Sequence, residues 1–463
     1  MAKTRNYEMD MTSGPIMGKL LVFTFPIIIT SVLQLLFNAA DTVVVGQFAG
    51  NEALAAVGSV QPVIGLLINV FNGLSLGAGV VVARYYGSGV QKDISDAVHS
   101  AIAMALICGV ACMVVGELFV HQLLAAVGIP ENVMPHAQIY TRIYFAGVPF
   151  LVLYNFAAAI LRSVGDTRRP LIFLSIAGVI NVLLNLFTVI VLNLGVAGVA
   201  IATTVSQGVS MLLVMRCLMT YDGAVKFQIR KLALAPQMCK EIARIGLPAG
   251  LQGTIFSISN VMIQSGINSF GSVTMAGNTA AGNVEGFLFV CTNAVYQSAM
   301  TFASQNVGAK KYERITAIML RSVLLVTIIG LIVGLGSYAL RVQLMHIYSN
   351  DPDVVAQGLV RFGTNMRIYF VYGLQDVFAG LLRGIGYSML PMITSIACIC
   401  GVRLFVVLVL FPMAQFHTLF TLYASYPVSW VLALIANMAC YFIFKHRLDL
   451  EVGLKPMKER RGA

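Results

Sequence analysis

Asp41 is the one carboxylate in the stretch NAADTVVVG (residues 38–46), which is otherwise mostly apolar. Glu285 and Asp376 share this setting, because both also lie inside long hydrophobic runs. An ionised carboxylate at the centre of a bilayer costs on the order of 3 kcal/mol, so each acid needs a partner, a cavity or a proton. These residues therefore indicate either ion binding or a hydrogen bond that fastens one helix to another.

Amide and hydroxyl side chains recur in the segments that we expect to face Asp41. Asn181 and Asn185 are four residues apart, which places them on one helix face, and Thr203 follows in the next hydrophobic run. Their oxygens around a carboxylate would coordinate Na+, or would surround an acid that exchanges its proton. The alternative is that the asparagines only join helices, at about 0.6 kcal/mol each. Secondary candidates for this cation site are Asn38, Thr204 and Gln207.

The second half of the chain places charges of both signs inside hydrophobic runs. Glu285 and Asp376 are secondary candidates for ion binding, and Arg367 and Arg403 lie within the same group of runs. We expect the two arginines to neutralise the two acids, which would give these residues a structural role. Aromatic residues and methionines nearby would suit flat lipophilic cations.

The composition places these residues in a membrane protein. Of the 463 residues, 58% are hydrophobic and only 11% are charged, and the mean hydropathy is +0.84. Soluble proteins carry about a quarter charged residues. Runs of about 20 apolar residues, enough to cross a bilayer as helices, recur along the whole chain. We predict an all-α membrane protein with twelve transmembrane helices, at residues 18–45, 54–83, 97–120, 137–161, 170–192, 196–218, 243–268, 276–303, 317–345, 358–381, 389–411 and 418–444.

The net charge of +11 is explained by its placement along the chain. With both termini in the cytoplasm, most Lys and Arg residues fall in cytoplasmic loops and tails, as the positive-inside rule requires. Anionic lipid headgroups are sufficient partners for this charge, and we expect no binding of nucleic acid. The first run lacks a cleavage site and is expected to remain as a transmembrane helix. We expect a multi-pass protein of the plasma membrane, of bacterial origin.

Two similar segments indicate an internal duplication. LRSVGDTRRP (residues 161–170) and LRGIGYSMLP (residues 382–391) match at an offset of 221, and Pro26 pairs with Pro248 within one residue of that offset. Each half would hold six helices, the parallel-repeat arrangement of several transporters. We predict two six-helix lobes and a cytoplasmic linker, with boundaries at residues 1–218, 219–242 and 243–463.

The duplication bears on the roles of two prolines and of Asp41. Pro26 and Pro248 lie in the first helix of each half, where each is either a static kink or a hinge. Asp41 has Ile263 as its counterpart, so this acid is not part of the shared architecture. The chain has no ATP-binding GxxxxGK[ST] motif, so transport would need an ion gradient. The eight cysteines have no spacing typical of a metal site.

Together these features resemble the multidrug and toxic compound extrusion (MATE) family. The resemblance rests on the two six-span halves, on Pro26 and Asp41 in the first span, on LRSVGDTRRP and LRGIGYSMLP, and on ASQNVGAKKYERI (residues 303–315). It implies a non-enzymatic antiporter that exports cationic or amphipathic compounds in exchange for H+ or Na+ by alternating access. It also implies an N-terminal cation site made of Asp41, Asn181, Asn185 and Thr203.

The resemblance also implies which cofactors and partners the chain has and which alternative function it could have. It implies no cofactor beyond the coupling ion, and no metal other than Na+ at Asp41. Lipid and small cationic or amphipathic substrates would be the partners, and we expect the chain to function as a monomer. The alternative function is that of a lipid or polysaccharide-precursor flippase, which would need a strongly cationic cavity for phosphate. Arg367 and Arg403 are the residues that favour it.

Overall fold

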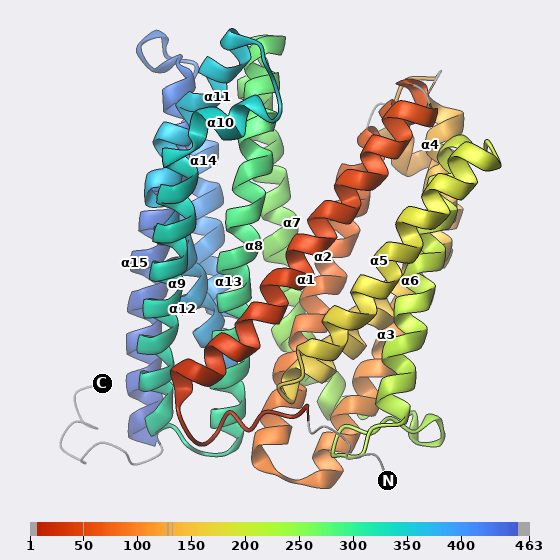
Figure 1. Ribbon diagram of the computed structural model, residues 1–463. Coiled ribbons are helices and arrows are strands. Elements are labelled where there is room, and N and C mark those ends of the chain that lie inside the picture. The colour runs from red at the N-terminus through yellow and green to blue at the C-terminus, as the bar shows by residue number, and fades with distance from the viewer. Residues whose placement is uncertain (1–6, 50, 127–128, 132, 452–463) are drawn as a thin grey trace. The chain divides into compact units, whose positions relative to one another are not determined.

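The computed structural model describes residues 7–49, 51–126, 129–131 and 133–451. Every regular element in these ranges is a helix (Figure 1). The outer parts of the two terminal segments that the sequence assigns to the cytoplasm, residues 1–6 and 452–463, lie outside the described residues.

The first half of the chain contains six long helices, with π-helical turns at the ends of two of them. The π turns are Val45–Ala49 after α1 and Phe187–Val191 after α5. The six are α1 (Ile16–Val44), α2 (Asn51–Ser88), α3 (Gln91–Ala126), α4 (Met134–Ser163), α5 (Arg168–Leu186) and α6 (Gly195–Met219).

The second half repeats this order with more interruptions. The ninth predicted span was too long, because α9 ends at Ala339 and a separate short helix follows. The tenth span is divided by a 3-10 turn at Met366–Ile368. The helices are α7 (Pro236–Asn268), α8 (Ser272–Gly308), α9 (Glu313–Ala339), α10 (Arg341–His346), α11 (Pro352–Asn365), α12 (Tyr369–Gly384), α13 (Met389–Ser395), α14 (Val402–Phe405) and α15 (Leu419–Glu451).

The two halves differ in how apolar their helices are. Nine helices in the described part of the chain are long and apolar enough to cross a membrane by length and composition. All six spans of the first half are among them, whereas α7, α8 and the pair α11 and α12 are not. These segments carry the polar side chains that the second half buries, including Gln252, Glu285 and Asp376.

Corresponding loops of the two halves share a backbone conformation. Gly165 and Gly386, at the same place in the two LR-x-x-G motifs, have φ of 92° and 109°. Gly89 and Lys310, which end the second span of each half, have φ of 74° and 58°. Each pair is separated by the offset of 221. The duplication therefore extends to left-handed turns that stop the helices at equivalent residues.

The described chain divides into two compact units. The N-terminal unit comprises Met1–Asp10 and Phe25–Gly250, and the C-terminal unit comprises Met11–Thr24 and Leu251–Ala463. The boundaries fall inside α1, next to Pro26, and inside α7, two residues after Pro248. Each unit thus includes a helical segment from the other half of the sequence.

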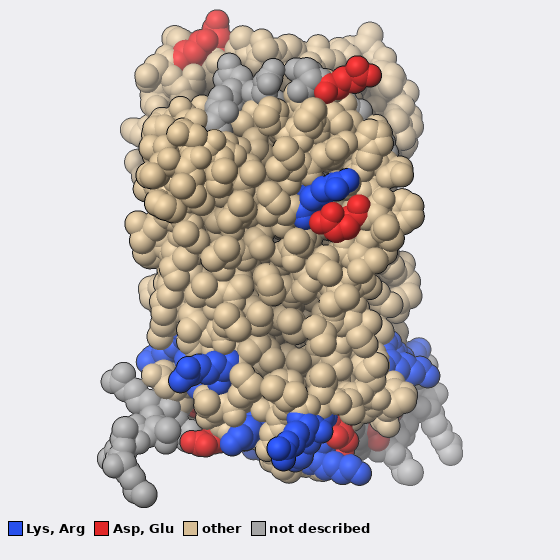
Figure 2. Space-filling view, turned by 90° about the vertical axis from the view of Figure 1, so that its right-hand side faces the viewer, with Lys and Arg blue, Asp and Glu red and all other residues tan. Residues whose placement is uncertain are grey.

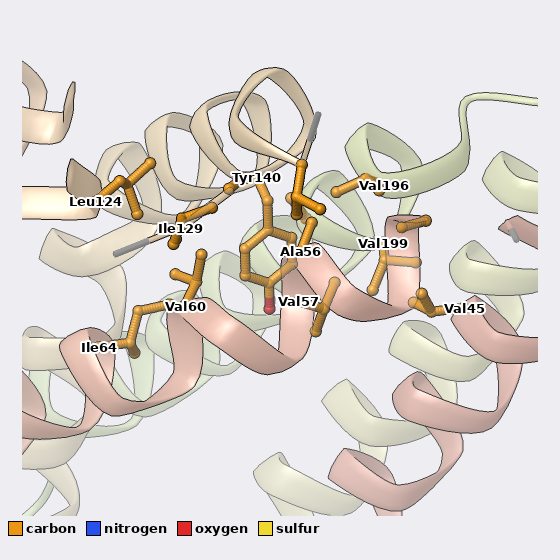
Figure 3. Packing of buried hydrophobic residues seen from close by; sticks show 14 of the residues in the cluster. Val45, Ala56, Val57, Val60, Ile64, Leu124, Ile129, Tyr140, Val196 and Val199 are labelled. Carbon is orange, nitrogen blue, oxygen red and sulfur yellow. The ribbon is translucent and has the colours of Figure 1, made fainter. Parts of the chain in front are cut away.

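A cluster of small and branched apolar residues packs the N-terminal unit at one end of α2 (Figure 3). Val57, Val60 and Ile64 lie on one face of α2, and Tyr140 and Val199 reach them from α4 and α6. All are less than a tenth exposed. This contact holds α2, α4 and α6 together close to the polar residues described below.

The surface of the N-terminal unit is divided by charge. Figure 2 shows one face of the molecule, on which Lys and Arg side chains gather at one end. Above them lies a broad area without charged side chains, apart from one pair of opposite sign. This distribution is typical of a protein whose apolar belt faces lipid.

Glycines allow very close packing of α2 against the first part of α7. A Cβ atom on Gly73 would lie 2.2 Å from the backbone nitrogen of Gly250, and one on Gly77 would lie 2.5 Å from the carbonyl oxygen of Ile242. Both distances are well below a van der Waals contact. Only glycine permits this backbone approach, which is common between membrane helices.

We predict that Gly73→Ala destabilises the protein, because the new methyl group would push α2 and α7 apart. Such overpacking typically costs about 1–3 kcal/mol. Thermal unfolding of the purified protein in detergent would show a lower midpoint. Gly65→Ala on the same helix is the control, because a Cβ there has no atom within 4 Å. Equal midpoints for the two variants would contradict the close contact.

Candidate functional site

Asp41 lies near the end of α1, where its half-buried carboxylate receives hydrogen bonds from two other helices. Asn185 Nδ2 of α5 donates to Oδ1 at 2.5 Å, and Thr203 Oγ1 of α6 donates to Oδ2 at 3.4 Å. Within the described residues Asp41 forms no ion pair. The structure thus joins α1, α5 and α6 around one carboxylate and supplies only neutral donors to it.

Asn181 completes this group from the same face of α5. Asn185 Nδ2 donates to Asn181 Oδ1 at 3.3 Å, and both asparagines are buried. Asn185 Oδ1 is also buried, and it accepts no hydrogen bond from the described residues. A buried acceptor without a donor is costly. The group around Asp41 therefore has an oxygen available for a cation or for the proton of a neutral Asp41.

The secondary candidates of this half have other partners. The exposed Asn38 accepts a hydrogen bond from Thr42 through its main-chain oxygen. Thr204 Oγ1 donates to the carbonyl of Ile143 at 3.1 Å, and Gln207 bonds Tyr144. None of the three candidates hydrogen-bonds Asp41 in the described part of the chain. Thr204 and Gln207 therefore connect α6 to α4, whereas Asn38 is exposed on α1.

Aromatic side chains of α4 lie next to this group. The rings of Tyr140 and Tyr144 are stacked with centroids 6.2 Å apart, and the Tyr140 hydroxyl is close enough to Asp41 for electrostatic interaction. A small, almost wholly apolar cavity continues along this wall. It is lined by Ile64, Ile68, Phe71, Tyr144, Phe145, Val148 and Asn155, among others.

In the C-terminal unit, Glu285 forms an ion pair that the sequence reading missed. Arg361 of α11 donates to it from two nitrogens, Nε to Oε1 at 3.0 Å and Nη2 to Oε2 at 2.5 Å. Asn365 Nδ2 donates to Oε1 at 2.9 Å, and Arg361 Nη1 also binds Asn278 Oδ1 at 2.6 Å. The acid and the arginine are 10% and 12% exposed. Bidentate pairing with full hydrogen bonding is the arrangement that makes a buried ion pair tolerable.

The expected pairing of Arg367 and Arg403 with the acids was wrong. Arg367 is exposed, donates to the Tyr338 hydroxyl and lies over that ring at 4.3 Å. Arg403 is buried and donates to Asn260 Oδ1 at 2.9 Å. The reason is geometric: Arg361 and Asn365 are four residues apart on α11, so one helix face supplies both partners of Glu285. That spacing is the signal in the sequence that would have identified them.

Asp376 is buried on α12, where its hydrogen-bond partners are neutral and the Arg383 guanidinium is close enough for electrostatic interaction. Gln375 Nε2 donates to its Oδ1 at 2.7 Å, and Tyr372 also hydrogen-bonds it. No ion pair of Asp376 exists among the residues that the structure describes. Of the two buried acids of this half, Asp376 therefore resembles Asp41 in having neutral hydrogen-bond partners, and Glu285 does not.

The LRSVGDTRRP motif forms a polar connection between α4 and α5. Asp166 accepts hydrogen bonds from the backbone and side chain of Arg169, whose guanidinium lies 4.7 Å from the rings of both Tyr7 and Tyr221. Burial raises the pKa of the Asp166 carboxyl, and its bonds with Arg169 oppose this. Tyr387 takes the place of Asp166 in the second half. The motif therefore fixes a turn in both halves, and among the described residues it carries an ion pair only in the first.

Pro26 and Pro248 interrupt the hydrogen bonding of long helices. Pro26 is buried within α1, and Thr30 Oγ1 donates to its carbonyl at 2.7 Å. Such back-bonding by threonine favours a bend. Pro248 occupies the corresponding place in α7. Both prolines lie inside long helices, and their role as a kink or a hinge stays a prediction.

Comparison with known proteins identifies the fold. The MatE family model matches residues 26–187 and 248–409, once in each half. A solved structure described as the outward-facing conformation of a multidrug resistance MATE family transporter has a TM-score of 0.87 at 21% identity, and the match covers 95% of this chain and 98% of that one. The expectation of an all-α membrane protein with twelve transmembrane helices in two six-helix lobes is thereby confirmed.

Curated relatives match over nearly their full length. The probable multidrug resistance protein YoeA of Bacillus subtilis is 25% identical over 439 residues, which is 92% of this chain and 94% of the relative. The FAD transporter of Shewanella oneidensis is 26% identical over 446 residues, 94% of this chain and 95% of the relative.

We predict that Glu285→Gln lowers the stability of the protein, because it leaves the Arg361 charge buried without a counter-charge. The expected loss is about 3 kcal/mol or more, seen as a lower midpoint of thermal unfolding in detergent. Adding Arg361→Gln to it should recover part of the loss. Glu117→Gln, a change at a half-buried acid of α3, is the control. A double variant no more stable than Glu285→Gln would contradict the pairing.

Proposed function

Because the chain belongs to the MatE family, whose members are membrane transporters and not enzymes, we propose that it exports cationic or amphipathic drugs in exchange for H+ or Na+ by alternating access. The observation that carries this proposal is the setting of Asp41. Its carboxylate has hydrogen-bond donors from α5 and α6 but no cationic side chain to neutralise it within the described residues. A carboxylate without a cationic partner can bind a coupling ion or the cationic group of a substrate.

The surrounding oxygens support either coupling ion. Na+ would bind the Asp41 carboxylate together with the carbonyl oxygen Oδ1 of Asn185, which has no other partner among the described residues, and the hydroxyl of Thr203. A proton on Asp41 would instead be donated to that same Oδ1. Either ion removes the negative charge that attracts a cationic substrate. Mutually exclusive occupation of one carboxylate is sufficient for exchange.

The conformational cycle follows from the first helix of each half. We place a hinge at Pro26 and at Pro248, each next to a boundary between the compact units. A missing backbone hydrogen bond at each proline lowers the cost of bending there. Binding of the ion or of the substrate would then shift the population between inward-open and outward-open states.

The membrane placement completes the proposal. A multi-pass protein with both termini in the cytoplasm agrees with the positive charge of Lys310, Lys311 and the loop at Arg168 and Arg169. The plasma membrane of a bacterium and function as a monomer belong to this proposal. The relatives described as probable multidrug resistance proteins favour several substrates over a single one.

The structure offers little for the alternative of a phosphate-gripping flippase. Arg367 and Arg403, the two residues that favoured it, have different partners and different exposure. A strongly cationic cavity would need them on one surface. We therefore retain drug export as the proposed function.

We predict that Asp41→Asn reduces ethidium efflux from cells at least tenfold, because an amide binds neither H+ nor Na+ as a carboxylate does. Efflux would be followed as loss of ethidium fluorescence after energisation, at matched amounts of protein in the membrane. Asp222→Asn is the control, because it makes the same change at an exposed position outside the spans. Unchanged efflux by Asp41→Asn would overturn the role of Asp41.

We predict that the coupling ion can be identified with the purified protein in lipid vesicles. A pH gradient and a Na+ gradient are imposed separately, and ethidium movement is recorded for each. Asn185→Val removes both Oδ1 and the Nδ2 donor to Asp41, and it should impair Na+-driven exchange more than tenfold and H+-driven exchange less, because Na+ needs more oxygen ligands than a proton. Transport that ignores both gradients would contradict antiport.

A further inference from the structure

Arg403 is a buried cation of the C-terminal unit, and only part of its guanidinium forms hydrogen bonds within the described residues. It is 5% exposed, and its Nη1 donates to Asn260 Oδ1 on α7 at 2.9 Å. One face of the guanidinium lies 4.2 Å from the centre of the Tyr426 ring. The Nε nitrogen is buried and has no hydrogen-bond partner among the described residues. A charged donor left unpaired in an apolar setting is unfavourable unless something binds it.

The side of the Arg403 guanidinium that contains Nε is called its free edge below. Arg361 in the same unit shows what such an edge can bind. Its Nε and Nη2 hold the two carboxylate oxygens of Glu285 side-on. The two buried acids of the unit are already engaged: Glu285 with Arg361, and Asp376 with Gln375 and Tyr372. In Arg403 the edge that contains Nε has no such carboxylate among the described residues. The protein therefore does not itself supply the oxyanion that this guanidinium fits.

The internal repeat shows that Arg403 replaces part of the cation site. The two stretches that match the family model begin and end 222 residues apart, at 26 and 248 and at 187 and 409. This register sets Arg403 opposite Asn181 and Asn260 opposite Asn38, one helical turn from Asn185 and Asp41. The contact between Asn260 and Arg403 thus joins the first and fifth spans of its half, as the contact between Asp41 and Asn185 does. The base thus aligns with Asn181 and not with Asp41, whose counterpart is Ile263, but both charges lie where the first and fifth spans of their half meet.

We propose that Arg403 anchors a binding site for the carboxylate of an aromatic small molecule. The site goes beyond the proposed export of cations, because it adds compounds that carry an acidic group, and its binding can be measured without transport. The exposed Asn260 and the half-buried Tyr426 border the guanidinium, so the site lies one side chain below the surface of the unit. A carboxylate would bind the free edge side-on, and its aromatic part would lie against the neighbouring rings.

The aromatic wall is the reason for choosing an aromatic ligand. Trp430 stands 6.1 Å from Tyr426 and 5.5 Å from Tyr372, measured between ring centroids. Its indole nitrogen is a second buried donor without a partner in the described part of the chain. Stacking of rings with offset or edge-on geometry is favourable beyond the area buried. The site has a positive charge at one end and aromatic side chains beside it. It therefore suits an aryl carboxylate better than a lipid phosphate, which has no ring.

Trp430 makes the site directly observable, because it is the one tryptophan of the chain. Dansylglycine carries a carboxylate and a fluorophore that accepts energy from tryptophan, and dansylglycinamide is its neutral counterpart. Titrated into the purified full chain in detergent, dansylglycine should quench Trp430 and bind about tenfold more tightly than the amide. Equal affinities of the two probes for the wild-type protein would overturn the proposal.

Two substitutions assign the preference to Arg403. Arg403→Gln should abolish the preference for the carboxylate, and Arg403→Lys should retain part of it, because the charge remains but the forked edge is lost. Arg367→Gln, an exposed arginine of the same unit with a tyrosine partner, should bind both probes as the wild type does. Should Arg403→Gln fail to fold, Arg403→Lys decides: a preference equal to that of the wild type would contradict the role of the guanidinium.

Two further experiments distinguish this site from a lipid-headgroup site and from the cation site at Asp41. Phosphatidylglycerol added to phosphatidylcholine nanodiscs should not displace dansylglycine, whereas benzoate should; the reverse would assign the site to a lipid headgroup and overturn the proposal. Asp41→Asn should leave dansylglycine binding unchanged. Failure of ethidium export with intact dansylglycine binding would thus refute the proposed function alone.

Discussion

A charged side chain inside a bilayer must be neutralised, hydrated or exchanged for a neutral form, and this constraint governs the arrangement of the polar residues in this protein. Glu285 meets it with Arg361, Asn365 and hydrogen bonds at both oxygens. Asp41 does not, because its donors from α5 and α6 are neutral. An acid that is permanently paired can hold helices together, whereas an acid without a counter-charge can respond to an ion. The described residues include both kinds of acid: Asp166 and Glu285 are paired with arginines, whereas Asp41 and Asp376 have neutral hydrogen-bond partners.

Much of the architecture could be predicted from the sequence because it depends on local patterns. Continuous apolar runs identify the helices of the first half, and the repeated LR-x-x-G segments identify the duplication, down to glycines with positive φ at equivalent turns. The group of Asp41, Asn185 and Thr203 followed from helical spacing together with the resemblance to the MATE family. The helices of the second half were harder to delimit. The 3-10 turn between α11 and α12, Met366–Ile368, contains neither glycine nor proline.

The pairing of charges could not be predicted, because it depends on how helices rotate against one another. Arg367 and Arg403 are within reach of the acids by depth in the membrane, yet one faces Tyr338 and the other Asn260. Arg361 lies near the start of its span, where an arginine would ordinarily extend to the water. Its rotation toward α8 is fixed by tertiary packing that a single sequence does not contain. The alignment of the two halves predicts which positions correspond, and it pairs Arg403 with an asparagine of the first half. It does not predict which residue Arg403 contacts.

The close contact of Gly73 and Gly77 with α7 also has a consequence for how the chain could have arisen from a gene duplication. The part of α7 before Gly250 belongs to the N-terminal unit, and Met11–Thr24 belongs to the C-terminal unit. A polypeptide cut in the loop between α6 and α7 would leave each fragment without a helix segment of its own compact unit. An ancestral half-length protein would have obtained that segment from a second copy of itself. The fused chain therefore preserves, within one molecule, the exchange of first helices that a dimer of half-length proteins would have made.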